Sequence, residues 1–512
     1  MKTAATTLAR REKVMLPTLL TLAGMTLIGA LAACGGMNAD TMAGPGHGGH
    51  GGNVGGGNLG ATAGGAQDFR QVRQLIEQGG VPEVDQLYVE GLLSEHDLPL
   101  AGPACPQLLC LNLAAGVTQT RFADLPDEAS ANAEGRTVLV QVGMSSGLKA
   151  ETFRREPLNL TLVVDVSGSM LGPKMSDTRY ALERLVDRLD EGDMVSLVAF
   201  SDEASLRLPP THGGDKATIR AAIATLKARG STNMEAGLKL GYEQLAEHQG
   251  AKRASRLMLF TDATPNVGAT HAGSFSALVT KAAGHGVGLT AFGVGLDFNT
   301  QLIDLIANLR GGNYFYLADS EAIRTVFDKD FDYLVTPLAY DLKLELTIPE
   351  GFRFVGAHGV KDWTAGAKTS TLTVPTVFLS RKKGAMLVEL ERDGIALQGS
   401  DGDVAVLSGK LSYELPNGSQ QEDQIAAVLS RAAFANADES YSQPAVRRVV
   451  ALVSEVNGMK EACRRYWAGQ RDDARALLSQ VEALLQGHQR ALGDSSLQAE
   501  IDLLAKLRSN MK

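Results

Sequence analysis

The sequence predicts an α/β protein in which a doubly wound, mostly parallel sheet is inserted into a β-sandwich-like domain, with an N-terminal helical module and a C-terminal helical tail. Three observations predict it. Apolar strands and amphipathic helices alternate across residues 157–337, which is typical of a parallel sheet covered by helices on both faces. Short extended runs flank this segment at 137–156 and 338–415, so one β-domain is split by the insertion. Helical spacing of apolar residues marks parts of residues 67–131 and 420–512.

The composition allows several folded units and excludes some functions. Hydrophobic residues make up 44% of the 512 residues and charged residues 21%, so the chain is not disordered throughout. The formal net charge of −9 argues against a nucleic-acid-binding protein, which needs a basic surface. Four cysteines are too few for a disulfide scaffold.

Residues 1–33 have the pattern of an export signal. Four basic residues precede an apolar stretch at 14–30, and the tetrad Leu31-Ala32-Ala33-Cys34 follows. This tetrad resembles the lipobox of bacterial lipoproteins, which implies that Cys34 is diacylated and becomes the new N-terminus. The alternative is a transmembrane anchor, because about 20 apolar residues can span a bilayer. Pro17 and the cysteine in register favour the lipobox.

Residues 34–66 are rich in glycine and are expected to form a flexible tether, because such a sequence cannot offset its ordering entropy. His47 and His50 lie in this stretch and offer only weak support for a metal site. Gly35 follows the cysteine where aspartate would signal retention, which favours outer-membrane delivery in an enterobacterial-type sorting system. The expected location is therefore the bacterial cell envelope, with a lipid anchor and a periplasmic or surface-facing protein.

The next segment, 67–131, is predicted to form an N-terminal module that begins with helices. Cys105 and Cys110 lie close together in it, and in an exported protein we expect them to form a disulfide. Cys463 would then be unpaired and buried.

Polar residues follow several predicted elements within 157–337, and ligands of such sheets bind beyond the carboxyl ends of the strands. Two carboxylates and three hydroxyls are the candidate metal ligands: Asp165, Ser167, Ser169, Thr232 and Asp262. All are hard oxygen donors, with no histidine or cysteine among them. This set suits Mg²⁺, with Mn²⁺ or Ca²⁺ as weaker alternatives.

The loops that carry these residues resemble the metal-ion-dependent adhesion site of von Willebrand factor A (VWA) domains, also called integrin I-type domains. The resemblance covers 157–337 and rests on Asp-x-Ser-x-Ser after the first strand, a threonine after Gly-Ser, and Thr-Asp at the end of a central strand. It implies that the two serines bind the metal directly, while the threonine and both aspartates act directly or through water. Ala263 and Ser231 replace glycines that are common in the family, at positions that are not ligands.

The expected function is metal-dependent binding of a protein partner, without enzymatic activity. A metal whose carboxylates act mainly through water keeps much of its positive charge and one open position, which an acidic residue of the partner can fill. The segment before the VWA-like region, the strands beside it and the lipobox also resemble bacterial VWA lipoproteins. The sequence does not determine the oligomeric state.

Two other functions have to be weighed. The metal could be structural, and the protein could be an assembly scaffold of the envelope that binds partners through the helical tail. A hydrolase is disfavoured: Ser145 lies in a Gly-x-Ser-x-Gly pattern, but the charged stretch after it does not form the helix that a nucleophile elbow requires.

Overall fold

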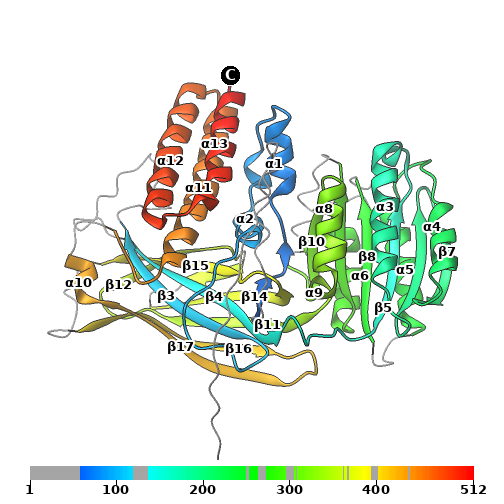
Figure 1. Cartoon of the computed structure of the whole chain (residues 1–512), viewed down its shortest axis with the longest axis horizontal. Coiled ribbons are helices and arrows are strands. Elements are labelled where there is room, and N and C mark those ends of the chain that lie inside the picture. The colour runs from blue at the N-terminus through cyan, green and yellow to red at the C-terminus, as the bar shows by residue number, and fades with distance from the viewer. Residues whose placement is uncertain are drawn as a thin grey trace, which may run out of the picture. The chain divides into compact units, whose positions relative to one another are not determined.

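The chain is described here by a computed structural model in which two sheets and a set of helices can be followed (Figure 1). The described residues are 58–118, 137–248, 253–262, 272–295, 305–306, 308–360, 362–365, 368–393, 402–435 and 439–512. The predicted export signal, Cys34 and both tether histidines lie outside them. Among the described helices, none combines the length and apolar character needed to cross a membrane.

One sheet has seven strands and is parallel except for one edge strand. Its strands, in spatial order, are β2 (Gly65–Ala66), β10 (Gly312–Leu317), β9 (Gly288–Val294), β8 (Ala254–Thr261), β5 (Leu158–Asp165), β6 (Met194–Phe200) and the antiparallel β7 (Ala204–His212). Every residue of β5 and β6 is buried, which explains why these strands are mostly apolar.

Helices cover both faces of this sheet. The elements that accompany it are η2 (Gly168–Met170), α3 (Pro173–Asp187), α4 (Lys216–Ala224), α5 (Met234–Ala246), α6 (Ala272–Gly284), α8 (Ser320–Arg324), η3 (Thr325–Asp330) and α9 (Phe331–Leu334). Leu162 and Val164 of β5 share a core with α3 and α4, whereas Val163 shares one with α5 and α6. This alternation places successive residues of one strand on opposite faces, so the predicted doubly wound α/β fold is confirmed.

The other sheet is antiparallel and has eleven strands. The strands along its main path are β12 (Phe352–His358), β15 (Ala385–Arg392), β4 (Thr137–Lys149), β1 (Asn58–Ala63), β14 (Thr369–Ser380), β11 (Pro337–Thr347), β16 (Asp403–Glu414) and β17 (Gln420–Ser430). Three more pair beside it: β13 (Asp362–Ala365), β3 (Cys110–Thr118) and β18 (Ser440–Tyr441). Phe352 at one end and Ile425 at the other belong to the same core, so this sheet encloses a single apolar interior.

Residues 58–66 correct the predicted extent of the tether, because they form strands in both sheets. β1 pairs with β14 and β4 of the antiparallel sheet, and β2 pairs with β10 of the parallel one. Leu59 and Ala61 are buried. β10 is consequently not at the edge of its sheet, since β2 lies outside it. A glycine-rich stretch stays flexible only where no neighbouring strand can pair with its backbone. Here strands of both sheets pair with residues 58–66.

The helices at the two ends of the described chain, except α10, share one core, so they are not separate modules. The N-terminal elements are α1 (Arg70–Glu77), η1 (Val84–Gln86) and α2 (Val89–Glu95), and the C-terminal ones are α10 (Arg431–Ala435), α11 (Pro444–Trp467), α12 (Arg471–Leu492), η4 (Ser495–Leu497) and α13 (Gln498–Asn510). Ile76, Leu92 and Val450 lie in the same cluster. The predicted helical tail starts too early, because residues 420–430 form β17, whose inward residues alternate with exposed ones.

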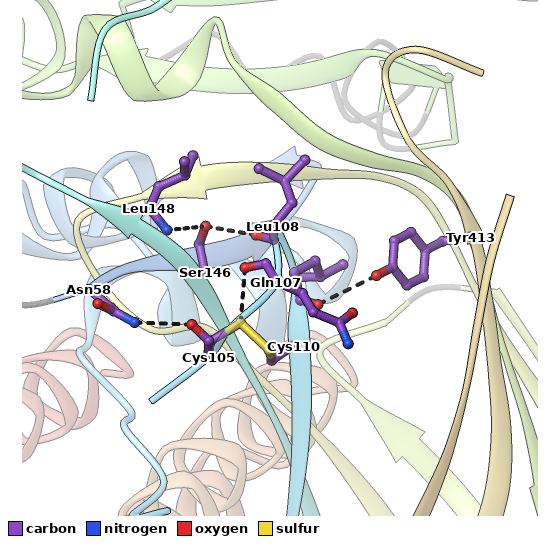
Figure 2. Close-up of a disulfide and its surroundings, with 9 residues drawn as sticks. Asn58, Cys105, Gln107, Leu108, Cys110, Ser146, Leu148 and Tyr413 are labelled. Atoms are coloured by element: carbon purple, nitrogen blue, oxygen red, sulfur yellow. Dashed lines mark hydrogen bonds between the residues drawn. A yellow bond between two sulfur atoms is a disulfide. The ribbon is translucent and has the colours of Figure 1, made fainter. Parts of the chain in front are cut away.

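Cys105 and Cys110 form a disulfide beside β4, and Cys463 is a free, buried thiol (Figure 2). Ser146 Oγ donates to the carbonyl of Leu108 at 2.7 Å, which ties the disulfide loop to the strand. Ser145 lies inside β4 and pairs with Cys110 across the sheet. The Gly-x-Ser-x-Gly pattern is therefore part of a strand rather than a sharp strand-to-helix turn.

Candidate metal centre

Four of the five predicted ligand residues lie together at the carboxyl ends of β5 and β8. Asp165 is the last residue of β5, and Asp262 directly follows β8. These strands are parallel neighbours in register, so their ends meet at the same edge of the sheet. Thr261 Oγ1 donates to Asp165 Oδ2 at 2.8 Å, which joins the two ends directly.

A chain of hydrogen bonds links the predicted donors. The backbone N–H of Ser167 donates to Asp165 Oδ1 at 2.8 Å. The hydroxyl oxygens of Ser167 and Ser169 lie 3.0 Å apart, and Ser169 Oγ donates to Asp262 Oδ1 at 2.9 Å. The two carboxylates and two serines thus form one continuous cluster, held by a single turn of 3-10 helix at 168–170.

Thr232 lies in the loop that closes over this turn. The N–H of Gly168 donates to the carbonyl of Gly230 at 2.9 Å, so the two loops are joined through their backbones. Thr232 is buried, with 2% of its surface exposed. The N-cap of α5 is Asn233, whose side chain accepts from Ala236 N, so Thr232 is not the cap of this helix.

Gly230 has a structural reason to be glycine. Its φ is +79°, a conformation that disfavours side chains. A Cβ there would also lie 2.3 Å from Oδ2 of Asp202. Asp202 accepts the N–H of Ser231 at 3.1 Å and so fixes the loop that carries Thr232.

Sequence reasoning did not single out Lys174 as part of the site. Its Nζ lies 2.6 Å from Asp262 Oδ2, from the first turn of α3. The sequence places Lys174 five residues after Ser169, which is the one indication that it could belong to the site. Spacing alone does not show where the ammonium group of a long side chain lies.

The electrostatics of the cluster favour a cation. Asp165 is fully buried, and burial raises its pKa to about 6, while hydrogen bonds from Ser167 and Thr261 lower it and the nearby Asp262 raises it further. Two buried carboxylates with one lysine between them are short of positive charge. Hydroxyl and carboxylate oxygens are ligands that Mg²⁺ prefers, so the residues present fit a divalent ion.

Other metal sites are not indicated within the described residues, where no group of three or more His, Cys, Asp or Glu side chains is placed to hold an ion. The candidate site has only two carboxylates and depends on its hydroxyls.

The comparisons with known proteins agree with this architecture. Residues 159–329 match the family model described as the von Willebrand factor type A domain. This segment is a VWA domain. Such domains generally mediate protein–protein interaction or adhesion.

Similarity extends beyond the VWA domain. A solved structure, the von Willebrand factor type A protein from Catenulispora acidiphila, has a TM-score of 0.51 at 16% identity and covers 77% of this chain and 90% of its own. This likeness concerns the fold alone. It shows that the arrangement around the VWA domain is not peculiar to this chain.

Two curated relatives set the scale of the sequence similarity. YfbK of Escherichia coli (strain K12) is 28% identical over 290 residues, which are 54% of this chain and 48% of that protein. The human inter-alpha-trypsin inhibitor heavy chain H4 is 30% identical over 164 residues, 30% of this chain and 18% of that protein. The chain therefore spans less than half the length of these relatives.

Proposed function

We propose that this chain is a lipid-anchored protein of the bacterial cell envelope that binds a protein partner through a divalent metal in its VWA domain, and that it is not an enzyme. The observation that carries the proposal is the oxygen cluster at the ends of β5 and β8. Asp165 and Ser169, at the end of β5, and Asp262, after β8, are linked there through Ser167 by hydrogen bonds of 2.8–3.0 Å. Such preorganised oxygens lower the cost of assembling a metal site.

Mg²⁺, when bound, supplies an electropositive centre that accepts a carboxylate of the partner. Ser167, Ser169 and Thr232 would hold it through their hydroxyls, and Asp165 and Asp262 would balance its charge. Ser169 is exposed, whereas Asp165 and Asp262 are buried, so the serine side of the cluster faces the partner. The bound cation would attract an acidic residue locally, although the chain itself is acidic overall.

The lipid anchor rests on the lipobox-like tetrad ending at Cys34. Metabolic labelling with a palmitate analogue, followed by membrane fractionation, tests it. Labelling of the wild-type chain and loss of label in Cys34→Ala support the anchor. An unlabelled wild-type chain would contradict it.

Partner binding is tested by crosslinked pull-down from envelope extracts with Mg²⁺ or with EDTA. Capture should disappear with EDTA and in Asp165→Ala. Asp215→Ala is the control, because Asp215 is a carboxylate in the same domain that only caps α4, accepting from Thr218 N at 3.2 Å. Capture that persists both in EDTA and in Asp165→Ala would rule out the metal-dependent function.

The alternative is a scaffold in which the metal is structural and the helical tail binds partners. Removal of residues 420–512 cannot test it, because β17 and α11 belong to the cores of the fold. Charge reversal of Asp472 and Asp473, both exposed at the start of α12, leaves the core intact. If this change abolishes capture while Asp165→Ala does not, the scaffold function is correct.

A further inference from the structure

A cleft of about 860 Å³ opens at the end of the VWA domain that is opposite the metal centre. Leu158, Ala254 and Gly288, at the start of β5, β8 and β9, line one side, whereas the candidate ligands follow the ends of β5 and β8. Tyr340 of β11 and the 415–417 turn after β16 line the other side. Its volume lies in the range of small-molecule sites, about 300–1,000 Å³.

The lining of this cleft is strongly basic, although the chain as a whole carries a net charge of −9. One carboxylate, Glu156, lines it. Five arginines line it: Arg154, Arg155, Arg253, Arg256 and Arg310. A concave surface of one charge sign concentrates ligands of the opposite sign.

Two of these arginines are already neutralised. Arg155 forms an ion pair with Asp193 at 2.6 Å and a second with Asp332 at 3.1 Å. Arg310 pairs with Asp341 and with Glu414. Carboxylates of the same chain balance their charges. These two arginines therefore shape the wall of the cleft more than they attract an anionic ligand.

The rim arginines have no such carboxylate. Arg154 Nη1 donates to the carbonyl of Phe153 at 2.6 Å, and Arg253 Nε donates to that of Gly192 at 2.7 Å. Neither forms an ion pair with any residue that the structure describes. Their positive charges remain available at the mouth of the cleft.

Arg256 is the central observation. It is buried, with 3% of its surface exposed, and among the described residues its guanidinium donates to Thr290 Oγ1 at 2.9 Å and to the carbonyl of Gly311 at 3.0 Å. No carboxylate of the described chain pairs with it, and burial lowers its pKa to about 10. Burying a charge without a counter-ion costs free energy. A bound anion would therefore stabilise the Arg256 guanidinium.

Neighbouring residues keep space for the Arg256 side chain. A Cβ at position 288 would lie 2.7 Å from its Nη2, so Gly288 leaves room for the guanidinium. The ring of Phe378 lies 5.2 Å from the guanidinium carbon and holds it by a cation–π contact.

Apolar side chains make up much of the remaining lining. Those with accessible surface are Leu108, Leu148, Phe153, Pro337, Leu415 and Pro416. A small inorganic anion would leave this surface in contact with water, whereas an aliphatic body would cover it.

We propose that this cleft binds a small amphipathic anion, with one carboxylate or phosphate head on Arg256, Arg154 and Arg253 and an aliphatic body against the apolar lining. The ligand can be a free metabolite or a lipid monomer, since both offer the same chemistry. The site is independent of the metal centre.

Calorimetric titration of the full chain with dodecyl phosphate, below its micelle concentration, tests the proposal. We expect saturable binding of one equivalent, weakened about tenfold or more in Arg256→Gln and in the rim variant Arg154→Gln/Arg253→Gln. Arg256→Lys should retain part of the affinity. Arg207→Gln, on the exposed face of β7, is the matched control and should bind as wild type.

Because Arg256→Gln could affect folding, the rim variant carries the test by itself: its arginines lie at the surface. Dodecyltrimethylammonium and inorganic phosphate should bind at least tenfold more weakly, since each lacks one half of the ligand. The proposal would be overturned if dodecyl phosphate bound equally well to the wild type and to the rim variant. It would also be overturned if the wild type bound dodecyl phosphate and dodecyltrimethylammonium equally well. Binding to anionic phospholipid vesicles without binding of monomeric dodecyl phosphate would overturn it as well.

Discussion

The ammonium of Lys174 lies 2.6 Å from Asp262 Oδ2, while the other oxygen of that carboxylate accepts from Ser169. The Asp262 side chain is completely buried, and that of Lys174 is 25% exposed. The lysine therefore supplies a tethered positive charge where the proposed metal would sit among the same carboxylates.

The substitution Lys174→Met distinguishes the effect of the lysine ammonium from that of the metal. Without metal, the variant should lose about 1–3 kcal/mol of unfolding free energy, because a buried carboxylate loses a charged hydrogen bond. Its affinity for Mg²⁺ should rise, because the repulsive charge is gone. Urea unfolding in EDTA and Mg²⁺ titration measure the two effects. Lys239→Met, exposed on α5, is the control. Unchanged Mg²⁺ affinity in Lys174→Met would show that the lysine does not oppose the metal.

Mg²⁺ should stabilise the wild-type chain but not Asp165→Asn. A ligand that binds only the folded state adds about 2.7 kcal/mol at 100 times its Kd. Thermal unfolding at rising Mg²⁺ concentration therefore shows an increasing Tm in the wild type. The amide keeps the shape of Asp165 and removes its charge, so its curve should not move. A parallel increase in both proteins would place the metal elsewhere.

Asp68 should make the stability of the chain depend on pH. Burial raises its pKa to about 6, against the pull of Arg70 and of the N–H groups of Tyr316 and Arg70. The folded state then binds the proton more tightly than the unfolded state. Its contribution is complete below about pH 4 and is lost as the pH rises through 6, by up to about 3 kcal/mol.

Asp68→Asn should remove that loss. The difference in unfolding free energy between variant and wild type, measured in urea at pH 4, 5, 6 and 7, should shift in favour of the variant as pH rises. All other groups titrate in both proteins, so the difference isolates Asp68. A difference that stays constant across this range would contradict the prediction.

The disulfide should contribute modestly because its loop is short. Cys105 and Cys110 are five residues apart, which limits the entropy removed from the unfolded chain to about 2 kcal/mol. Cys105→Ser/Cys110→Ser should lose about that amount in urea unfolding. Reducing agent should destabilise the wild type equally and leave the variant unchanged. A reductant effect on the variant would point to another cause.

Truncation distinguishes tether from strand at the N-terminal side. A chain without residues 34–57 should unfold at the same urea concentration as the full chain. A chain without residues 34–66 should be strongly destabilised, because β1 lies between β14 and β4 and buries Leu59 and Ala61. Equal stability of both chains would show that β1 is dispensable.

Much of the fold was predictable because it depends on local periodicity. Mostly apolar strands and amphipathic helices mark the VWA domain, and four of the five oxygen donors follow its strands in an order that the sequence displays. The errors arose where strand pairing overrode composition. Glycine-rich residues 58–66 became strands because they meet the distant strands β14, β4 and β10. Residues 420–430 became β17 because they form a hairpin with the neighbouring β16 across the 415–419 turn.

The sequence by itself determined the chemistry of the candidate metal centre: two carboxylates and three hydroxyls at the ends of strands and in a neighbouring loop. Only the tertiary structure placed Lys174 against Asp262 and buried Arg256 away from every carboxylate of the part of the chain that it describes. The physical reason is reach. A short aspartate or serine acts where its backbone lies, whereas a lysine or arginine acts several ångströms away, at a point that the packing of other elements sets.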